Sequence, residues 1–180
     1  MYNTWEELER ECKSCKKCKL SSGRINVVIG KGNKKANVMF IGEGPGAEED
    51  KEGIPFVGRA GKVMDMALLG LGVEKEDIYI ANVVKCRPPG NRNPEDSEAG
   101  ACIDFLKAQI VLVDPKIVVL LGNIALNHII GKGHGITASR GKWIEKDGIQ
   151  YMPTFHPAAL FRDEDKKIAF WKDLKEVFKK

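Results

Sequence analysis

Residues 38–46 of the chain read VMFIGEGPG, and this stretch decides the fold class. Four consecutive apolar residues, with no alternating polar position, are typical of a strand that is covered on both faces, as in a parallel sheet between helices. The glycines and the Gly-Pro pair that follow end the strand abruptly. We therefore expect an α/β protein with a glycine-rich turn at the carboxyl end of a buried strand.

The rest of the chain continues this alternation of strand and helix. Apolar runs predict further strands at residues 78–84, 117–121 and 149–154. Helices are expected from Thr4, which begins a capping-box pattern with Glu7, and at residues 60–69, 94–113, 124–130 and 164–178. In the long helix, Asn93 is the expected N-cap and Pro94 the first residue. The pattern predicts a single domain, residues 1–180, with helices packed on a mainly parallel sheet.

Composition excludes several classes of protein. Hydrophobic residues make up 43% of the chain and charged residues 30%, so the chain has enough apolar surface to fold and is not disordered. The longest strongly apolar stretch, residues 117–121, is far shorter than the roughly 18 residues of a membrane span. The polar N-terminus shows no signal peptide. We therefore expect a cytoplasmic protein with no membrane partner.

The net charge of +4 is mild, but the charges are unevenly distributed. Between Arg10 and Lys35 the chain carries nine basic residues and only one acidic residue, Glu11. Such a cluster is typical either of a solvated basic face or of a surface that binds a polyanion such as nucleic acid. Composition alone leaves both interpretations open.

The five cysteines are also unevenly placed. Cys12, Cys15 and Cys18 form a CxxCxxC run, and Cys86 and Cys102 follow alone. A disulfide framework is not expected in a reducing compartment. Thiolates two residues apart can bind one metal centre together, and Cys86 and Cys102 could complete the set. Zinc and a [4Fe–4S] cluster are both chemically allowed, and the odd total leaves one cysteine over.

Ligands of parallel α/β sheets bind beyond the carboxyl ends of the strands. Four segments of this chain are expected at that edge: residues 42–46, Asn82, the proline-rich loop 85–94, and residues 155–157. Each has an ordinary structural explanation, such as a common Gly-Pro turn or a histidine that satisfies its own backbone. Their convergence at one edge indicates a site.

Taken in order, these segments resemble the family 4 uracil-DNA glycosylases. The resemblance is carried by GEGPG at residues 42–46, PFVGRAG at 55–61, NVVKCRPP at 82–89 and HPAAL at 156–160. It extends from about Cys15 to Arg162. It implies a three-layer α/β/α sandwich around a four-stranded, mainly parallel sheet, and an enzyme that excises uracil from DNA without cleaving the strand.

The resemblance also implies roles for individual residues. The implied ligands of a [4Fe–4S] cluster are Cys15, Cys18, Cys86 and Cys102, although the extra Cys12 leaves open whether the pair Cys12 and Cys15 replaces the pair Cys15 and Cys18. The implied uracil contacts are Gly42, Glu43, Gly44, Phe56, Asn82 and His156, with Glu49 as a further candidate. The implied minor-groove loop consists of Leu160, Phe161 and Arg162.

The chemistry of base excision agrees with these assignments. A glycosylase must flip its nucleotide out of the stack, and bond cleavage then leaves negative charge on uracil O2. Backbone amides of residues 42–44 and the side chain of His156 are suited to stabilise that charge. Other uracil glycosylases carry an Asp where this chain has Gly44, so Glu43 is the expected group for positioning water. The expected catalytic residues are therefore Glu43 and His156.

The expected partner is uracil-containing DNA, single- or double-stranded, bound by a monomer whose Arg87 and Arg92 contact phosphates. Three other interpretations explain part of the sequence: a nucleic-acid-binding module without catalysis, a nucleotide-using transferase and an iron–sulfur electron carrier. The transferase interpretation lacks the Lys and Ser/Thr of a phosphate loop, and the electron carrier leaves the pocket residues unexplained. Release of the base would separate an enzyme from a binding module.

Overall fold

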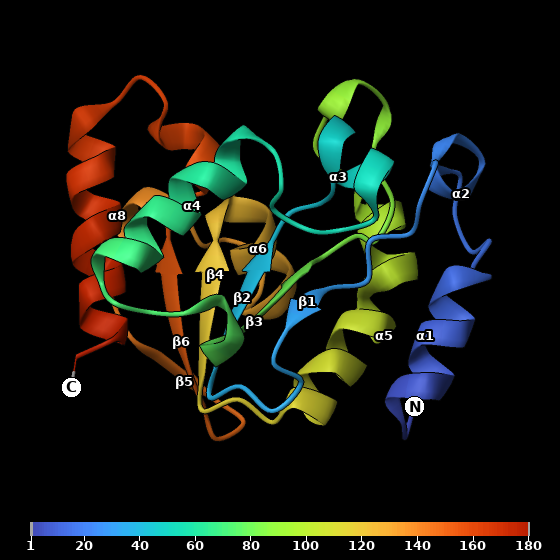
Figure 1. The fold of residues 1–180 in the computed structure, drawn as a ribbon, viewed down its shortest axis with the longest axis horizontal. Coiled ribbons are helices and arrows are strands. Elements are labelled where there is room, and N and C mark those ends of the chain that lie inside the picture. Colours follow the sequence, from blue (N-terminus) through green and yellow to red (C-terminus); the bar gives the residue numbers. More distant parts are fainter. Residues whose placement is uncertain (1, 180) are drawn as a thin grey trace.

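Four parallel strands form the centre of the fold, which we describe for residues 2–179 from a computed structural model (Figure 1). The sheet has six strands in the order β1-β3-β2-β4-β6-β5. The strands are β1 (Lys31–Gly32), β2 (Val38–Gly42), β3 (Ile78–Asn82), β4 (Ile117–Leu121), β5 (Ile144–Lys146) and β6 (Ile149–Thr154). The central strands β3, β2, β4 and β6 are mutually parallel.

The expected four-stranded sheet therefore corresponds to the centre of a six-stranded one, which corrects the strand count. The additional strands β1 and β5 pair antiparallel with β3 and β6 at the two edges. They are two and three residues long and mostly exposed. Strands this short and polar have no apolar periodicity, so the sequence pattern could not predict them.

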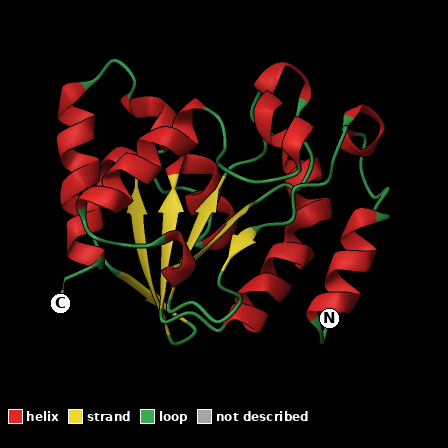
Figure 2. Cartoon of the chain, viewed as in Figure 1, coloured by secondary structure: helices red, strands yellow, loops and turns green. Residues whose placement is uncertain are grey.

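Helices cover both faces of the sheet (Figure 2). They are α1 (Trp5–Lys13), α2 (Leu20–Gly23), α3 (Ala47–Glu52), α4 (Arg59–Gly70), α5 (Asp96–Val113), α6 (Gly122–Ile129), α7 (Ile136–Ser139) and α8 (Glu164–Val177), with 3₁₀ turns η1 (Lys75–Asp77), η2 (Pro89–Asn91) and η3 (Pro157–Leu160). The expected cap of α1 is confirmed, because the Thr4 side chain accepts from the Glu7 amide. Within residues 2–179, no helix is both long and apolar enough to cross a membrane.

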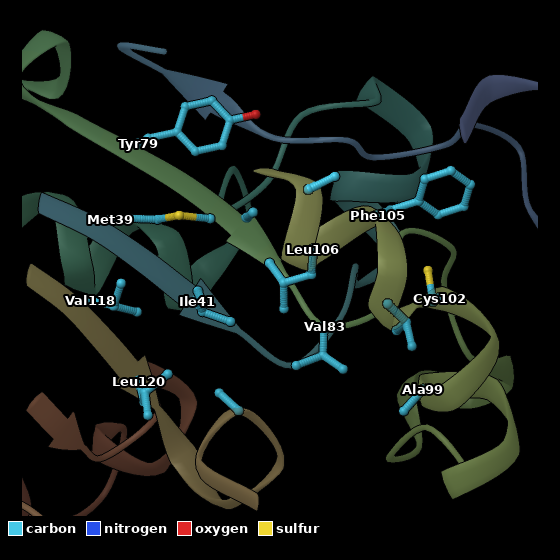
Figure 3. Close-up of a cluster of buried hydrophobic side chains, with 14 of the residues drawn as sticks. Met39, Ile41, Tyr79, Val83, Ala99, Cys102, Phe105, Leu106, Val118 and Leu120 are labelled. Atoms are coloured by element: carbon cyan, nitrogen blue, oxygen red, sulfur yellow. The ribbon is translucent and has the colours of Figure 1, made fainter. Parts of the chain in front are cut away.

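The core consists of two apolar layers, one on each face of the sheet. Alternate strand residues such as Met39 and Ile41 face α1, α5 and α6, and this layer is shown in Figure 3. Their neighbours, such as Phe40, face α4 and α8. Both faces of β2 are fully buried. The near-continuous apolar runs of the central strands are thereby explained, and the expected α/β class is confirmed.

Two expected boundaries were wrong. Strand β3 ends at Asn82 rather than at residue 84. Helix α5 begins at Asp96 with Glu95 as N-cap, so Asn93 and Pro94 remain in the preceding loop. The carboxylate of Glu98 accepts from the Glu95 amide at 2.8 Å and fixes the start of the helix there. The ion pair between Glu98 and Arg92, six residues earlier and described below, accounts for this start.

Candidate active site and thiol cavity

A pocket of about 660 Å³ lies beyond the carboxyl ends of the parallel strands. Most of the predicted site residues line it together: Glu43, Gly44, Glu49, Phe56, Asn82, Arg92, His156 and Phe161. These residues come from the turn after β2, helix α3, the loop before α4, the end of β3, the loop before α5, and the segment after β6. The structure thus brings together residues that lie more than a hundred positions apart in the chain.

Phe56 is held in a backbone conformation that few large residues adopt. Its φ is +54°, in the left-handed region. Two glycines allow the backbone and ring to approach closely: a Cβ at Gly42 would lie 2.7 Å from the Phe56 ring, and one at Gly61 would lie 1.8 Å from the Phe56 carbonyl oxygen. Strain of this kind is found at ligand sites. It places the aromatic ring on the wall of the pocket.

Asn82 closes the inner end of the pocket at the last residue of β3. The residue is 2% exposed, and its Oδ1 is a buried atom without a hydrogen-bond partner. An orphaned buried acceptor costs free energy unless a ligand supplies the missing donor. Its backbone carbonyl, in contrast, accepts from the Nζ of Lys85 at 2.7 Å. The side-chain amide is therefore positioned for a ligand that carries a donor.

His156 forms part of the same wall, with its ring centroid 5.8 Å from that of Phe56. Its Nδ1 accepts from the Ala158 amide at 3.1 Å. Because Nδ1 accepts, the neutral ring carries its proton on Nε2. Burial lowers the pKa of His156 to about 4. The side chain is consequently a neutral N–H donor at physiological pH.

The two pocket glutamates have different surroundings. The Glu49 carboxylate accepts from the amides of Gly46, Val57 and Gly58, at 3.1, 3.1 and 2.7 Å. It thereby joins the glycine-rich turn to the Phe56 loop. Glu43 is partly buried in the pocket wall, and desolvation raises its pKa. A carboxyl group of raised pKa in a cleft is a candidate for proton transfer or for positioning water.

The rim of the pocket contains a residue that sequence reasoning missed. The Arg59 guanidinium lies 4.0 Å from the centroid of the Phe161 ring, a distance typical of a cation–π pair. Arg59 lies within the quoted PFVGRAG motif, so its position in that motif was the available signal. The pair gives the pocket mouth a positive charge and a flat apolar surface.

Contrary to the expectation from the sequence, Leu160 does not lie on this rim. It is 1% exposed and packs in the core layer with Phe170 and Leu174. A 3₁₀ turn places residues three apart on the same side, and in η3 both Pro157 and Leu160 point inward. Of the three residues expected to enter the minor groove, Phe161 and Arg162 remain at the surface.

The two arginines of the proline-rich loop also differ. Arg92 donates to both carboxylate oxygens of Glu98, at 2.8 and 2.7 Å, and Glu98 is 1% exposed. The guanidinium lowers the pKa of Glu98 to about 2. Arg87 instead donates to the Asn91 side chain at the loop surface. Arg92 is therefore held by the protein, and Arg87 is the freer of the two charges.

A second, narrower cavity lies between the N-terminal segment, the loop after β3 and α5. All five cysteines line it: Cys12, Cys15, Cys18, Cys86 and Cys102. All five are free thiols. The Arg24 guanidinium donates to the Cys15 carbonyl oxygen at 2.8 Å and to the Cys86 sulfur at 3.3 Å. The structure thus brings the three cysteine-bearing segments together around one space.

The environment of these thiols is apolar. Burial raises the pKa of Cys12 to about 12 and that of Cys102 to about 11. Among residues 2–179, no three His, Cys, Asp or Glu side chains are placed to hold one metal ion between them. The five thiols therefore line a common space without the arrangement of a single-ion site.

Comparison with known proteins agrees with this geometry. The uracil DNA glycosylase superfamily matches residues 29–175. A type-4 uracil-DNA glycosylase of Thermotoga maritima is 46% identical over 173 residues, 93% of this chain and 90% of that protein. One of Sulfurisphaera tokodaii is 46% identical over 185 residues, 97% and 82% of the two chains. A type-5 enzyme of Pyrobaculum aerophilum is 31% identical over 146 residues, 72% and 64%. The chain belongs to the uracil-DNA glycosylase superfamily, within its type-4 family.

Proposed function

We propose that this protein is a monofunctional uracil-DNA glycosylase, which flips uracil out of DNA and hydrolyses its N-glycosidic bond to initiate base excision repair. The observation that carries this proposal is the orphaned Oδ1 of Asn82, buried at the inner end of a pocket beside an aromatic ring. A flipped uracil would supply the missing donor. The cost of extruding a base from the stack, a few kcal/mol, is then offset by contacts in the pocket.

Base choice follows from the Asn82 amide. Uracil presents an N3–H donor beside an O4 acceptor, so the amide Oδ1 accepts from N3 and Nδ2 donates to O4. Cytosine presents the reverse pattern and opposes the same orientation. The ring of Phe56 supplies a face on which the base stacks.

Leaving-group stabilisation is assigned to His156. The bond breaks with negative charge developing on uracil O2, and the neutral imidazole offers its Nε2–H to that oxygen. The Ala158 amide fixes the ring through Nδ1 and so keeps the proton on the catalytic side. Backbone amides of residues 42–44 add to the stabilisation of the anion.

Glu43 is the proposed positioning group for the attacking water. Residue 44 cannot readily carry a carboxylate, because a Cβ there would lie 2.7 Å from Val84 Cγ2. Stabilisation of the leaving group therefore supplies more of the rate enhancement. Among the described residues that line the pocket there is no lysine. Schiff-base chemistry, and the strand cleavage that follows from it, would need an amine that these residues do not provide.

The DNA strand is proposed to run across the pocket mouth. Phe161 and Arg162 lie beside the pocket on the segment after His156, and Arg87 lies on the loop opposite. The basic residues between Arg10 and Lys35 are proposed to contribute further phosphate contacts. We infer that the single domain of residues 1–180 acts as a monomer inside the cell, where free cysteines persist.

The thiol cavity fits a [4Fe–4S] cluster. Four thiolates is the ligand set that such clusters require, and the cavity is lined by five cysteines. We assign Cys15, Cys18, Cys86 and Cys102 as ligands. Cys12 lies within α1, 1% exposed among core residues, whereas Cys15 and Cys18 lie in the turn after it. When bound, the cluster would cross-link the N-terminal segment, the proline-rich loop and α5.

Excision from an oligonucleotide that contains one uracil tests the proposal, with alkaline scission to reveal the abasic site. Wild-type protein is expected to release uracil, and Asn82→Asp to lose at least about 100-fold in single-turnover rate, because a carboxylate then faces O4 without a donor. Asn37→Asp, the same change at the exposed amino end of the sheet, is the control. Tight binding without base release would refute the function, and undiminished excision by Asn82→Asp would show that Asn82 does not read the base.

A further inference from the structure

Lys85 is a fully buried lysine that the proposed reaction does not use. It is 1% exposed and lies one residue before Cys86. Its Nζ donates to the Asn82 carbonyl oxygen at 2.7 Å and to Gln109 Oε1 at 2.5 Å. Its backbone amide donates to the sulfur of Cys102 at 3.3 Å. The residue therefore contacts both the thiol cavity and the base-reading strand.

Both side-chain partners of Lys85 are neutral. No ion pair among the described residues includes it, although buried lysines are rare unless they are paired. The groups around it that can become anionic are the thiols of Cys12, Cys86 and Cys102. Lys85 also lines the thiol cavity itself. A negative charge in that cavity would compensate the buried ammonium.

Gln109 keeps the Lys85 side chain in one position. It is 0% exposed, and its Nε2 donates to the Ile29 carbonyl oxygen at 2.9 Å and to the Tyr79 hydroxyl at 3.0 Å. With its amide nitrogen committed to these acceptors, Gln109 can present only Oε1 to Lys85. The ammonium group is thus fixed between β3, α5 and the thiol cavity.

We propose that Lys85 is the internal counter-ion of the thiolate-bound iron–sulfur centre and, through the Asn82 carbonyl, a positioning residue that couples this centre to the base pocket. The inference rests on the iron–sulfur assignment proposed above. A cation beside four thiolates lowers the free energy of the anionic site. Its hydrogen bond to Asn82 fixes the strand end from which the base-reading amide projects.

The reduction potential of the cluster tests whether the Lys85 ammonium acts as its counter-ion. A reduced cluster carries one more negative charge, so a neighbouring cation stabilises it and raises the potential. Lys85→Met removes the cation at similar volume and is expected to shift the midpoint potential to a more negative value and to lower iron retention. Lys107→Met, an exposed lysine on the same helix as Cys102, is the control and is expected to leave both unchanged. An unchanged potential in iron-loaded Lys85→Met would overturn the proposal.

Gln109→Glu provides a second variant should Lys85→Met fail to fold. It keeps Lys85 but pairs it with a carboxylate, so a counter-ion role again predicts a more negative potential. An unchanged potential there would overturn the proposal as well. The rate of uracil excision tests the coupling between the thiol cavity and the base pocket. Lys85→Met is expected to excise uracil about tenfold more slowly at unchanged DNA affinity, which is the effect of losing about one hydrogen bond. The potentials report on Lys85 even if no base is released, so failure of the glycosylase proposal remains distinguishable.

Discussion

The proposed base pocket is lined by Asn82 and the thiol cavity by Lys85 and Cys86 of the same segment, and the two are stabilised in different ways. In the base pocket, the chain satisfies most polar groups itself: Glu49 accepts from three backbone amides, and His156 accepts from a fourth. In the thiol cavity, five cysteines surround a space in which no described residue is a charge partner for Lys85. The first site is organised by its own hydrogen bonds, whereas we propose that the second is completed by the centre that it binds.

The way in which each site is stabilised determines how it can contribute to catalysis. Preorganised donors accelerate a reaction because they need no rearrangement when charge develops. The pocket gains this rigidity locally, from the Glu49 and His156 hydrogen bonds. The loop that carries Arg87 and Arg92 depends instead on Cys86 and on the Arg92–Glu98 ion pair. The proposed iron centre is therefore expected to affect the loop that carries Arg87 and Arg92 more than the base pocket.

The largest effect is expected from the cysteines. Cys86→Ala or Cys102→Ala should lose nearly all of the roughly four irons per chain that a [4Fe–4S] cluster contributes, together with visible absorbance and thermal stability. Cys12→Ala should retain the iron, because Cys12 is assigned to the core of α1. Metal analysis of anaerobically purified protein measures this. Stoichiometric zinc would contradict the cluster, and iron loss in Cys12→Ala alone would reassign the ligands.

The second-largest effect is expected from removal of the His156 imidazole. His156→Ala should slow single-turnover excision by about 100- to 1,000-fold, the typical effect of deleting one donor to a developing oxyanion. DNA affinity should change little, because O2 becomes anionic only as the bond breaks. Single-turnover rates and binding isotherms on the same uracil oligonucleotide separate these effects. An excision rate within about threefold of wild type would assign His156 a structural role only.

The pH dependence of the folded protein should reflect the same histidine. His156 has a pKa of about 4 in the fold against an ordinary value of 6.5. Since the unfolded chain binds the proton more readily, His156 contributes no pH dependence above about 6.5, and stability declines as the pH falls toward about 4. Urea unfolding of wild type and His156→Gln at several pH values measures this. A wild-type profile no steeper than that of the variant would contradict the burial argument.

The smallest effect is expected at the loop surface. Arg87→Glu should reduce the slope of log affinity against log salt by about 0.9 for each phosphate of double-stranded DNA that Arg87 neutralises in the wild type. Arg92 is excluded from this test because its reversal would also break the Glu98 ion pair. Lys175→Glu in the last turn of α8 makes the same change of net charge and is the control. Equal slopes for Arg87→Glu and wild type would place this loop away from DNA.

Much of the fold could be predicted from the sequence because its central strands are apolar on both faces. Residues 38–41, 117–121 and 149–154 lie in strands as predicted. The edge strand β1 could not be predicted, since it pairs with β3, far along the chain. Strand β5 forms a hairpin with the adjacent β6 through Asp147 and Gly148, but it is too short and polar to show an apolar pattern. The predicted start of α5 was wrong for a different reason: residue preferences favoured Asn93 and Pro94, whereas the side-chain ion pair between Arg92 and Glu98 places the start later.

The residues of the candidate site could be predicted from the sequence, but the contacts that hold them in place could not. The rule for carboxyl strand ends placed residues 42–46, Asn82 and His156 at one edge, and the structure does so. Burial of Leu160 depends on tertiary contacts, and the ion pair of Arg92 depends on the path of the loop before α5; residue types reveal neither. The same holds for Lys85, whose sequence neighbours gave no sign of its contact with Gln109, 24 residues away.

Amide hydrogen exchange of the protein with and without its iron tests most directly whether the two sites are stabilised differently. The amides of Gly46, Val57 and Gly58, bound to Glu49, should keep their protection after iron is removed by a chelator. The amide of Lys85, bound to the Cys102 sulfur, and that of Val28, bound to the Lys85 carbonyl oxygen, should lose protection. Equal loss in both groups, or no loss at Lys85 and Val28, would contradict the account.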